Sequence, residues 1–388
     1  MTIYIIVLLA FLTHVGFAGA RLAVPLFAVD HGATPFVVGI VFSLFAAFPM
    51  VLALPAGRMS DRLGFKLPLV FGTGGVFAGL FVMFVVPSMA MLYFSVTLLG
   101  IAFMALQLAT QTLAGAIAKR EDRARNFSLL SLGFALANFV GPLLTGYLID
   151  HAGYAWTFLW LSIPLLVATI VSVMADRWLP PVQAKSEAAR GGMFDLLKIP
   201  ALRNTLIASG IVSAAWDVYQ FLMPIYGRSL DLSATAIGVI MSAFAISIVL
   251  VRVFLPMAVR RAGEAELLTY AMFVAAAAFC LFPLFEAPWT LALVSFLLGI
   301  GCGCGQPLSM TLIFNASPRG RMGEATGMRI TVNQITHFVI PLLFGLVGSV
   351  AGFATVFLTN AGGLIAGGYM SLRNHAAVRK NDEHGKTD

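Results

Sequence analysis

The stretch GRMSDRLGFKLPL, residues 57–69, is a short segment with three basic residues and one acidic residue between two long apolar runs. The run before it covers residues 36–56, and the run after it covers residues 67–86. About 20 mostly apolar residues are enough for a helix to cross a bilayer. The stretch is therefore predicted to form a loop at one membrane surface, between two transmembrane helices.

The same alternation of apolar runs and short links extends over the whole chain. Hydrophobic residues make up 60% of the 388 residues and charged residues 11%, and the mean hydropathy is +0.93. An ordinary soluble domain has about one quarter charged residues. We therefore predict an all-α integral membrane protein with twelve transmembrane helices. They cover residues 2–28, 36–56, 67–86, 89–118, 127–149, 155–175, 203–225, 236–258, 267–285, 289–315, 326–350 and 353–372.

The positive charges indicate how the chain is oriented. Every Lys and Arg except Arg21 and Arg228 falls at the ends of helices that share one side with the N-terminus. Cytoplasmic loops hold the excess of Lys and Arg, so both termini are predicted to be cytoplasmic in a multi-pass protein of the inner membrane. The net charge of +7 follows from this topology and does not indicate a nucleic-acid partner.

A shift of 199 residues aligns one half of the chain with the other without a gap. In this register Gly39 aligns with Gly238, and Leu98-Leu99-Gly100-Ile101 aligns with Leu297-Leu298-Gly299-Ile300. We predict two six-helix bundles, residues 1–175 and 203–372, related by a pseudo-twofold axis along the membrane normal. Residues 176–202 would form a cytoplasmic linker, and residues 373–388 a cytoplasmic tail. Such architectures bind substrate near the midplane, between the halves.

The opening stretch resembles the signature loop of the major facilitator superfamily, Gly-x-x-x-Asp-Arg-x-Gly-x-Lys/Arg. The matching residues are Gly57, Asp61, Arg62, Gly64 and Lys66. The resemblance implies a two-bundle transporter that works by alternating access. It also implies that the aspartate pairs with the other half and stabilises the outward-facing state.

The second half carries an altered version of this loop. Arg261 and Gly263 match, whereas Arg260 replaces the aspartate. We expect an asymmetric gate with Arg261 in it. Arg252, eight residues before Arg260, is predicted to act at the gate or to extend to the membrane surface rather than to bind substrate.

The segment ALANFVGPLLTGYL, residues 135–148, resembles the antiporter signature of exporters in this superfamily, Gly-x-x-x-Gly-Pro-x-x-Gly-Gly. Gly141, Pro142 and Gly146 match, while Ala137 and Thr145 stand where two glycines belong. This partial match favours export.

Ionisable residues inside the spans are the first candidates for a site, because a charge in hydrocarbon costs about 2.5–3.5 kcal/mol on insertion scales. Arg21 and Gln220 align in the repeat and should face the central cavity, together with Trp216 and Asp217. Asp217 has no charged counterpart, because Ala18 aligns with it. Arg21 and Asp217 form either a static ion pair or a pair that opens when a substrate anion binds the arginine and a proton binds the aspartate.

Other polar positions are shared between the halves. Asn333, Gln334 and His337 lie on one face of a helix, and His337 aligns with Asn138. His337 either carries a proton or only donates a hydrogen bond. Gln107 and Gln306 also align, as ligand contacts or as hydrogen bonds between helices. The pairs Asp30-His31 and Asp150-His151 are interpreted as solvated starts of loops rather than as metal sites.

These observations predict a secondary active transporter for a small organic solute, coupled to protons and with export preferred. The alternatives are a proton-coupled symporter that takes up a small organic anion, and a receptor that does not transport. The four histidines outside the tail are scattered, which argues against an intramembrane enzyme, and no nucleotide motif is present. We expect a monomer in the bilayer without a cofactor. We also expect no metal site, since Cys302 and Cys304 point about 200° apart on a helix.

Overall fold

The computed structural model describes residues 2–63, 65–117, 123–177, 179, 193–317 and 322–384, without the side chains of some of them. Apart from short turns between the helices, this part is helical. The elements are α1 (Thr2–Asp30), α2 (Pro35–Leu63), α3 (Lys66–Val85), α4 (Met89–Ala116), α5 (Arg123–Val173), η1 (Met174–Arg177), η2 (Met193–Lys198), α6 (Pro200–Ser229), α7 (Ala234–Ala262), α8 (Glu264–Leu281), η3 (Phe282–Leu284), α9 (Pro288–Ala316) and α10 (Met322–His384). Ten of these helices are long and apolar enough to cross a membrane.

Two of the ten helices provide more than one crossing. α5 and α10 are each interrupted by a glycine in a conformation that L-residues rarely adopt, Gly153 with φ 78° and Gly352 with φ 80°. The two glycines are one repeat length of 199 residues apart. Each joins two helical segments, so the ten helices provide the twelve segments predicted from the sequence. The predicted all-α membrane fold is confirmed.

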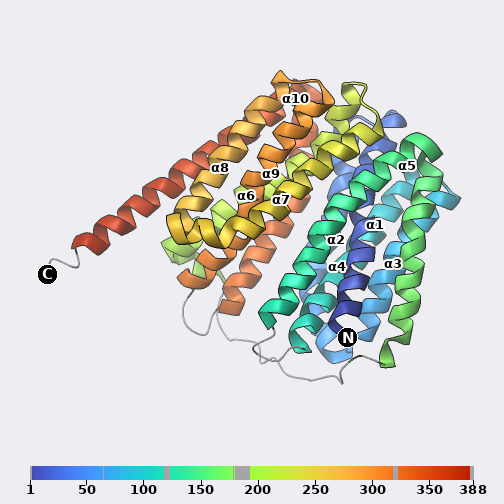
Figure 1. Ribbon diagram of the computed structural model, residues 1–388, viewed down its shortest axis with the longest axis horizontal. Coiled ribbons are helices and arrows are strands. Elements are labelled where there is room, and N and C mark those ends of the chain that lie inside the picture. Colours follow the sequence, from blue (N-terminus) through green and yellow to red (C-terminus); the bar gives the residue numbers. More distant parts are fainter. Residues whose placement is uncertain are drawn as a thin grey trace.

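The two halves of the chain lie side by side, α1–α5 in blue to green and α6–α10 in yellow to red (Figure 1). We call one end of the bundle the Asp30 end, after the last residue of α1. The opposite end, where α6 begins, is the Pro200 end. α10 continues past the predicted end of its span at residue 372 to His384, and in Figure 1 its last turns project away from the bundle. The first part of the predicted tail is thus helical.

The repeat is visible in the way the halves pack together near the Asp30 end. Gly39 of α2 lies so close to the Pro341 carbonyl of α10 that a side chain would collide with it. Gly238 of α7 meets the Pro142 carbonyl of α5 in the same way, with 2.5 Å between that oxygen and a Cβ built on the glycine. Both contacts join one half to the other, and they are related by the shift of 199 residues. At this end the halves touch backbone to backbone.

The sequence also determines where the paired helices begin. Thr34 and Ser233, again one repeat apart, precede α2 and α7. Their hydroxyls accept hydrogen bonds from Val37 N at 3.4 Å and from Ala236 N at 3.1 Å. Such N-caps satisfy amide groups that would otherwise lack partners at a helix start. These caps fix the start of the two helices that form the contacts between the halves.

Candidate functional site

Asp217 lies on α6, about 18 Å from the end of the helix at Ser229, as the helical rise gives it. Its side chain is 1% exposed, and two basic side chains reach it. Arg21 of α1 places Nη2 3.5 Å from Asp217 Oδ1. His337 of α10 approaches the other oxygen, with a hydrogen bond between Nδ1 and Oδ2. The carboxylate therefore joins a helix of the first half to two helices of the second.

The Arg21–Asp217–His337 cluster changes its charge with one proton. With His337 neutral, the positive arginine and the negative aspartate cancel. A proton on His337, or on Asp217, leaves the cluster with one net positive charge. Because a buried charge without a partner is expensive, an added proton would leave one positive charge of the cluster without a partner. The contact between Asp217 and His337 is the feature that the sequence did not reveal, although both residues were candidates.

Arg21 is positioned by an aromatic ring as well as by the carboxylate. Its guanidinium carbon lies 4.8 Å from the centre of the Phe42 ring of α2, within the range of a cation–π contact. The Arg21 side chain is 21% exposed, and its buried Nε has no hydrogen-bond partner. The arginine is thus only partly satisfied, which leaves it a donor for a further acceptor.

The neighbours of Asp217 on α6 line the same region. Gln220 is buried, and Trp216 packs edge-on against Phe244 of α7 at 5.0 Å between ring centres. Of the polar residues on α10, Asn333 lies 3.5 Å from Ser209 Oγ of α6, and Gln334 is half-buried. These contacts join α6, α7 and α10 within the second half.

In the first half, the residue that corresponds to His337 is an asparagine that lies beside a histidine. This asparagine, Asn138 of α5, donates a hydrogen bond to the Phe134 carbonyl at 2.9 Å, and its amide lies beside the imidazole of His14 of α1. His14 is buried among aromatic rings, with Nδ1 unpaired. His14 and Asn138 are far apart in the sequence, so the sequence did not indicate that they lie side by side.

Arg252 of α7 lies inside the bundle. Its Nη1 donates to Ser131 Oγ of α5 at 3.1 Å, and its Nη2 donates to Gln306 Oε1 of α9 at 3.2 Å. The side chain therefore bonds to two helices instead of extending to the membrane surface. Gln107, the repeat counterpart of Gln306, is half-buried on α4.

The sequence model of the Major Facilitator Superfamily matches residues 6–334 and 205–387 of this chain. Together these ranges span nearly the whole chain. The chain belongs to the Major Facilitator Superfamily. As a member it is a multi-pass membrane protein that transports small molecules and is not an enzyme.

Two kinds of relatives agree with this membership. The multidrug resistance protein MdtG of Klebsiella pneumoniae is 24% identical over 389 residues, covering 96% of this chain and 94% of that protein. MdtG of Salmonella typhimurium is 23% identical over 363 residues, covering 91% and 90%. Among solved structures, the peptide transporter POT in complex with sulfate superposes with a TM-score of 0.82 at 15% identity, covering 97% of this chain and 94% of that one. A mutant of the nucleoside transporter NupG gives 0.77 at 17%, covering 96% and 99%.

In this superfamily member, charged side chains close the Asp30 end. Asp30 of α1 accepts hydrogen bonds from Arg228 of α6, Nε at 2.9 Å and Nη2 at 2.6 Å, and from the Tyr154 hydroxyl of α5 at 2.5 Å. The bidentate geometry is the strong form of an arginine–carboxylate pair. It explains why Arg228 lies away from the basic loops, as one of the two exceptions to the charge pattern of the sequence.

Asp150 of α5 forms a second link at this end. Its carboxylate accepts from the Ala234 and Thr235 amides, at 3.0 and 2.7 Å, at the start of α7 in the other half. In the repeat-related place, Ser349 Oγ accepts from the Phe36 amide at the start of α2, at 2.9 Å. Asp30 and Asp150 are therefore more than the solvated loop starts that the sequence indicated, because both carboxylates also accept hydrogen bonds from the other half.

The two histidines that follow these aspartates contact backbone carbonyls of their own helices. Nδ1 of His31 lies 2.7 Å from the Phe27 carbonyl, and Nδ1 of His151 lies 2.8 Å from the Tyr147 carbonyl, each one turn earlier in its own helix. Within the described part of the chain no group of three metal-ligating side chains comes together.

For most of the signature loop the structure gives no description of the side chains. This holds for Gly57, Asp61, Arg62 and Gly64. Lys66 begins α3 and is half-buried, and Arg261 is exposed at the end of α7. The role of these residues at a gate stays a prediction.

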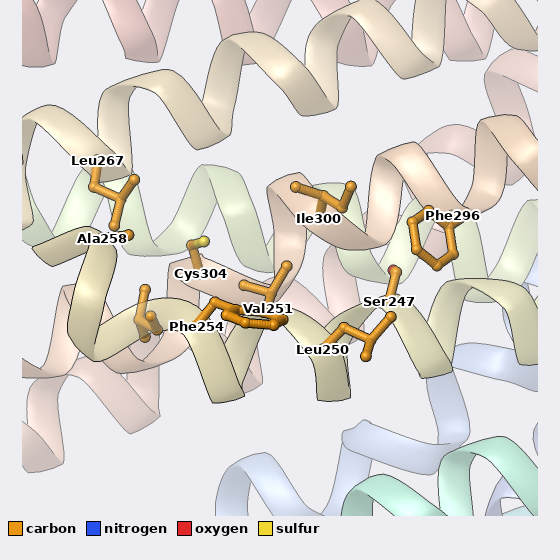
Figure 2. Close-up of a pocket in the computed structure, with 10 residues that line it drawn as sticks. Ser247, Leu250, Val251, Phe254, Ala258, Leu267, Phe296, Ile300 and Cys304 are labelled. Carbon is orange, nitrogen blue, oxygen red and sulfur yellow. The ribbon is translucent and has the colours of Figure 1, made fainter.

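An apolar groove of about 300 Å³ lies between α7, α8 and α9 (Figure 2). Its wall includes Leu250, Phe254, Leu267, Ile300 and Cys304. Leu250 and Phe254 are 43% and 60% exposed, so the groove opens on the outer surface of the helices, where lipid would lie. None of the predicted site residues lines it.

Proposed function

We propose that this transporter exports a small organic molecule in exchange for protons, by alternating access between its two halves. The observation that carries the proposal is the contact of the buried Asp217 with both Arg21 and His337. A carboxylate between a permanent cation and a titratable imidazole can accept or release a proton at a small cost in separated charge. The names of the MdtG relatives, multidrug resistance proteins, support export.

The cycle uses the asymmetry between the two ends of the bundle. At the Asp30 end the halves touch through glycines, carbonyls and charged links, whereas Arg252 reaches across to Ser131 with a long side chain nearer the Pro200 end. With the termini on the cytoplasmic side, this form is closed to the outside. Substrate binding from the cytoplasm opens the contact between α1 and α6 and leads to the form open to the outside, where Asp217 takes up a proton. The protonated protein returns to the form closed to the outside and releases the proton to the cytoplasm. The transporter works as a monomer of two bundles, residues 1–175 and 203–372, in the inner membrane.

Uptake of a small organic anion with a proton is the second candidate function. Arg21 favours it, since its guanidinium keeps an unpaired Nε and would bind an anion when Asp217 is protonated. In that case the proton and the substrate would move in the same direction. A receptor that does not transport would bind a ligand without counterflow.

The deciding experiment uses purified protein in proteoliposomes with Asp217→Asn. The variant keeps the shape of the side chain but cannot release a proton. We expect it to lose transport driven by a pH gradient and to keep the exchange of substrate across the membrane. Accumulation of substrate against its gradient by the variant would show that Asp217 does not carry the proton. Thr169→Ser, in the second segment of α5 away from the cluster, serves as the control.

The direction of coupling is tested with the same vesicles. An inside-acidic gradient should drive uptake of a fluorescent amphiphile by wild-type protein if protons and substrate are exchanged. The opposite gradient should drive it if both move together. Absence of counterflow in both gradients would identify a receptor.

A further inference from the structure

Arg252 holds a positive charge that no carboxylate neutralises in the described part of the chain. Its two hydrogen bonds end on neutral oxygens, Ser131 Oγ and Gln306 Oε1, and its buried Nε has no partner. Arg21 and Arg228, by contrast, each lie against an aspartate. Arg252 is therefore a largely buried cation for which the described residues provide no carboxylate.

The depth of Arg252 makes this lack costly. The residue lies about 15 Å from the end of α7 at Ala262 by the helical rise, well inside a bilayer core of about 30 Å. A guanidinium offers five donors and pairs best with a planar anion that takes two of them at once. Here two donors meet single neutral acceptors, which leaves the guanidinium able to bind an anion.

The place of Arg252 is one that a transported molecule would occupy. Ser131 belongs to the first half and Gln306 to the second, so the three side chains meet at the junction of α5, α7 and α9. The segments that carry them are otherwise largely apolar: SLLSLGF (128–134), VLVRVF (249–254) and CGCGQPL (302–308). In the repeat, Ala53 aligns with Arg252. A residue without a counterpart is not required by the architecture that the halves share.

We propose that Arg252, with Gln306 and Ser131, binds the anionic group of the substrate, and that the substrate is an amphiphilic organic anion such as an aromatic carboxylate. The inference rests on the proposed transport function and names its substrate class. It separates two tasks: Asp217 and His337 handle the proton, and Arg252 binds the charge of the substrate.

The test is equilibrium binding to the purified full-length protein in a neutral detergent, without transport. The probes are 2-naphthoate and 2-naphthamide, which share a ring system and differ in charge. A charge-assisted hydrogen bond contributes about 1.5–3 kcal/mol, so wild-type protein should bind the carboxylate about ten- to a hundredfold more tightly. Arg252→Gln should bind both probes equally, and Arg252→Lys should keep part of the preference. Arg203→Gln removes an exposed arginine of α6 and should behave as wild type.

Several results would overturn the assignment. Equal binding of the two probes by wild-type protein, or no binding of either, would contradict it. A preference for naphthoate that survives in Arg252→Gln would contradict it as well. If that preference is lost in Arg21→Gln, the anion binds at Arg21 instead. Elution as a single symmetric peak on size exclusion shows that each variant is folded.

A lipid headgroup is the other source of the same chemistry. Repeating the measurement in nanodiscs of phosphatidylcholine, with and without phosphatidylglycerol, distinguishes the sources. If the anionic lipid abolishes naphthoate binding and stabilises wild type but not Arg252→Gln, the site holds lipid and the substrate assignment fails. Loss of proton-driven transport in vesicles leaves these binding results unchanged, so failure of the proposed function is recognised separately.

Discussion

Replacing Asp150 by alanine is expected to open the Asp30 end of the bundle. Asp150 belongs to α5, and its two acceptor bonds, at 3.0 and 2.7 Å, go to the first amides of α7 in the other half. These bonds exist only while the halves are closed at this end. Their loss therefore removes stability from the closed form and leaves the open form unchanged.

The size of the effect follows from the two contributions of the carboxylate. Replacing an N-cap by alanine costs about 0.5–2 kcal/mol, and a negative charge at a helix N-terminus contributes about 0.3–1 kcal/mol. Asp150 is exposed, so water screens its charge. We expect about 1 kcal/mol in total, which changes the ratio of closed to open molecules about fivefold. Asp150→Asn keeps an acceptor without the charge and should have a smaller effect.

The assay measures the distance between spin labels on Val85→Cys and Leu284→Cys, with the native cysteines replaced by serine. These repeat-related positions are 57% and 70% exposed; Val85 ends α3, and Leu284 ends η3 directly after α8, both at the Asp30 end of opposite halves. Asp150→Ala should increase the population with the longer distance. Ser349→Ala, which removes the neutral cap at the repeat-related place, should do so less. An unchanged distance distribution in Asp150→Ala, or a shift to shorter distances, would refute the reasoning.

Other substitutions test separate parts of the structure. Arg21→Ala should leave the preference for an acidic over a neutral ligand unchanged in equilibrium binding, because Arg252 binds the anionic group, and a selective loss of the acidic ligand would move the anion to Arg21. Gly238→Ala should shift the same spin-label distances toward the open form, because a Cβ there lies 2.5 Å from the Pro142 carbonyl; an unshifted distribution would contradict this. Gly153→Ala should lower the free energy of unfolding by about 1–3 kcal/mol, since its backbone conformation is close to glycine-only. Its thermal unfolding is compared with that of Gly362→Ala, where no atom lies within 4 Å of the added carbon and little change is expected.

The fold could be predicted because the features that determine it, apolar runs and the internal repeat, can be recognised directly in the sequence. Hydropathy indicated the helices, and the repeat of 199 residues aligned glycines that later proved to touch carbonyls of the other half. The register even aligns Gly153 with Gly352, which divide two of the long helices. Fold and repeat both depend on small residues and apolar runs, and these are visible along one chain.

The candidate site was only partly predictable, since its contacts depend on rotamers and on helices distant in sequence. The positions of Arg21 and Asp217 in their helices predicted that the two residues pair. Nothing in the residue spacing indicated that His337 would contact the second carboxylate oxygen. Arg252 was placed at the gate because of its distance from Arg260, whereas its long side chain turns inward to Ser131 and Gln306. Sequence position sets the depth of a charge, and the direction of the side chain decides its partner.

The packing of the first half explains why Asp217 has no counterpart. Ala18, which aligns with it, lies where α1 meets Gly141 of α5, and a Cβ on that glycine would be only 2.9 Å from the Ala18 Cβ. A carboxylate at position 18 would have no room. In the second half Ile340 aligns with Gly141, and the wider spacing that it implies accommodates Asp217 beside His337. The partial antiporter motif that carries Gly141 thus packs one half tightly, and the departure from that packing in the other half gives the protein its buried carboxylate.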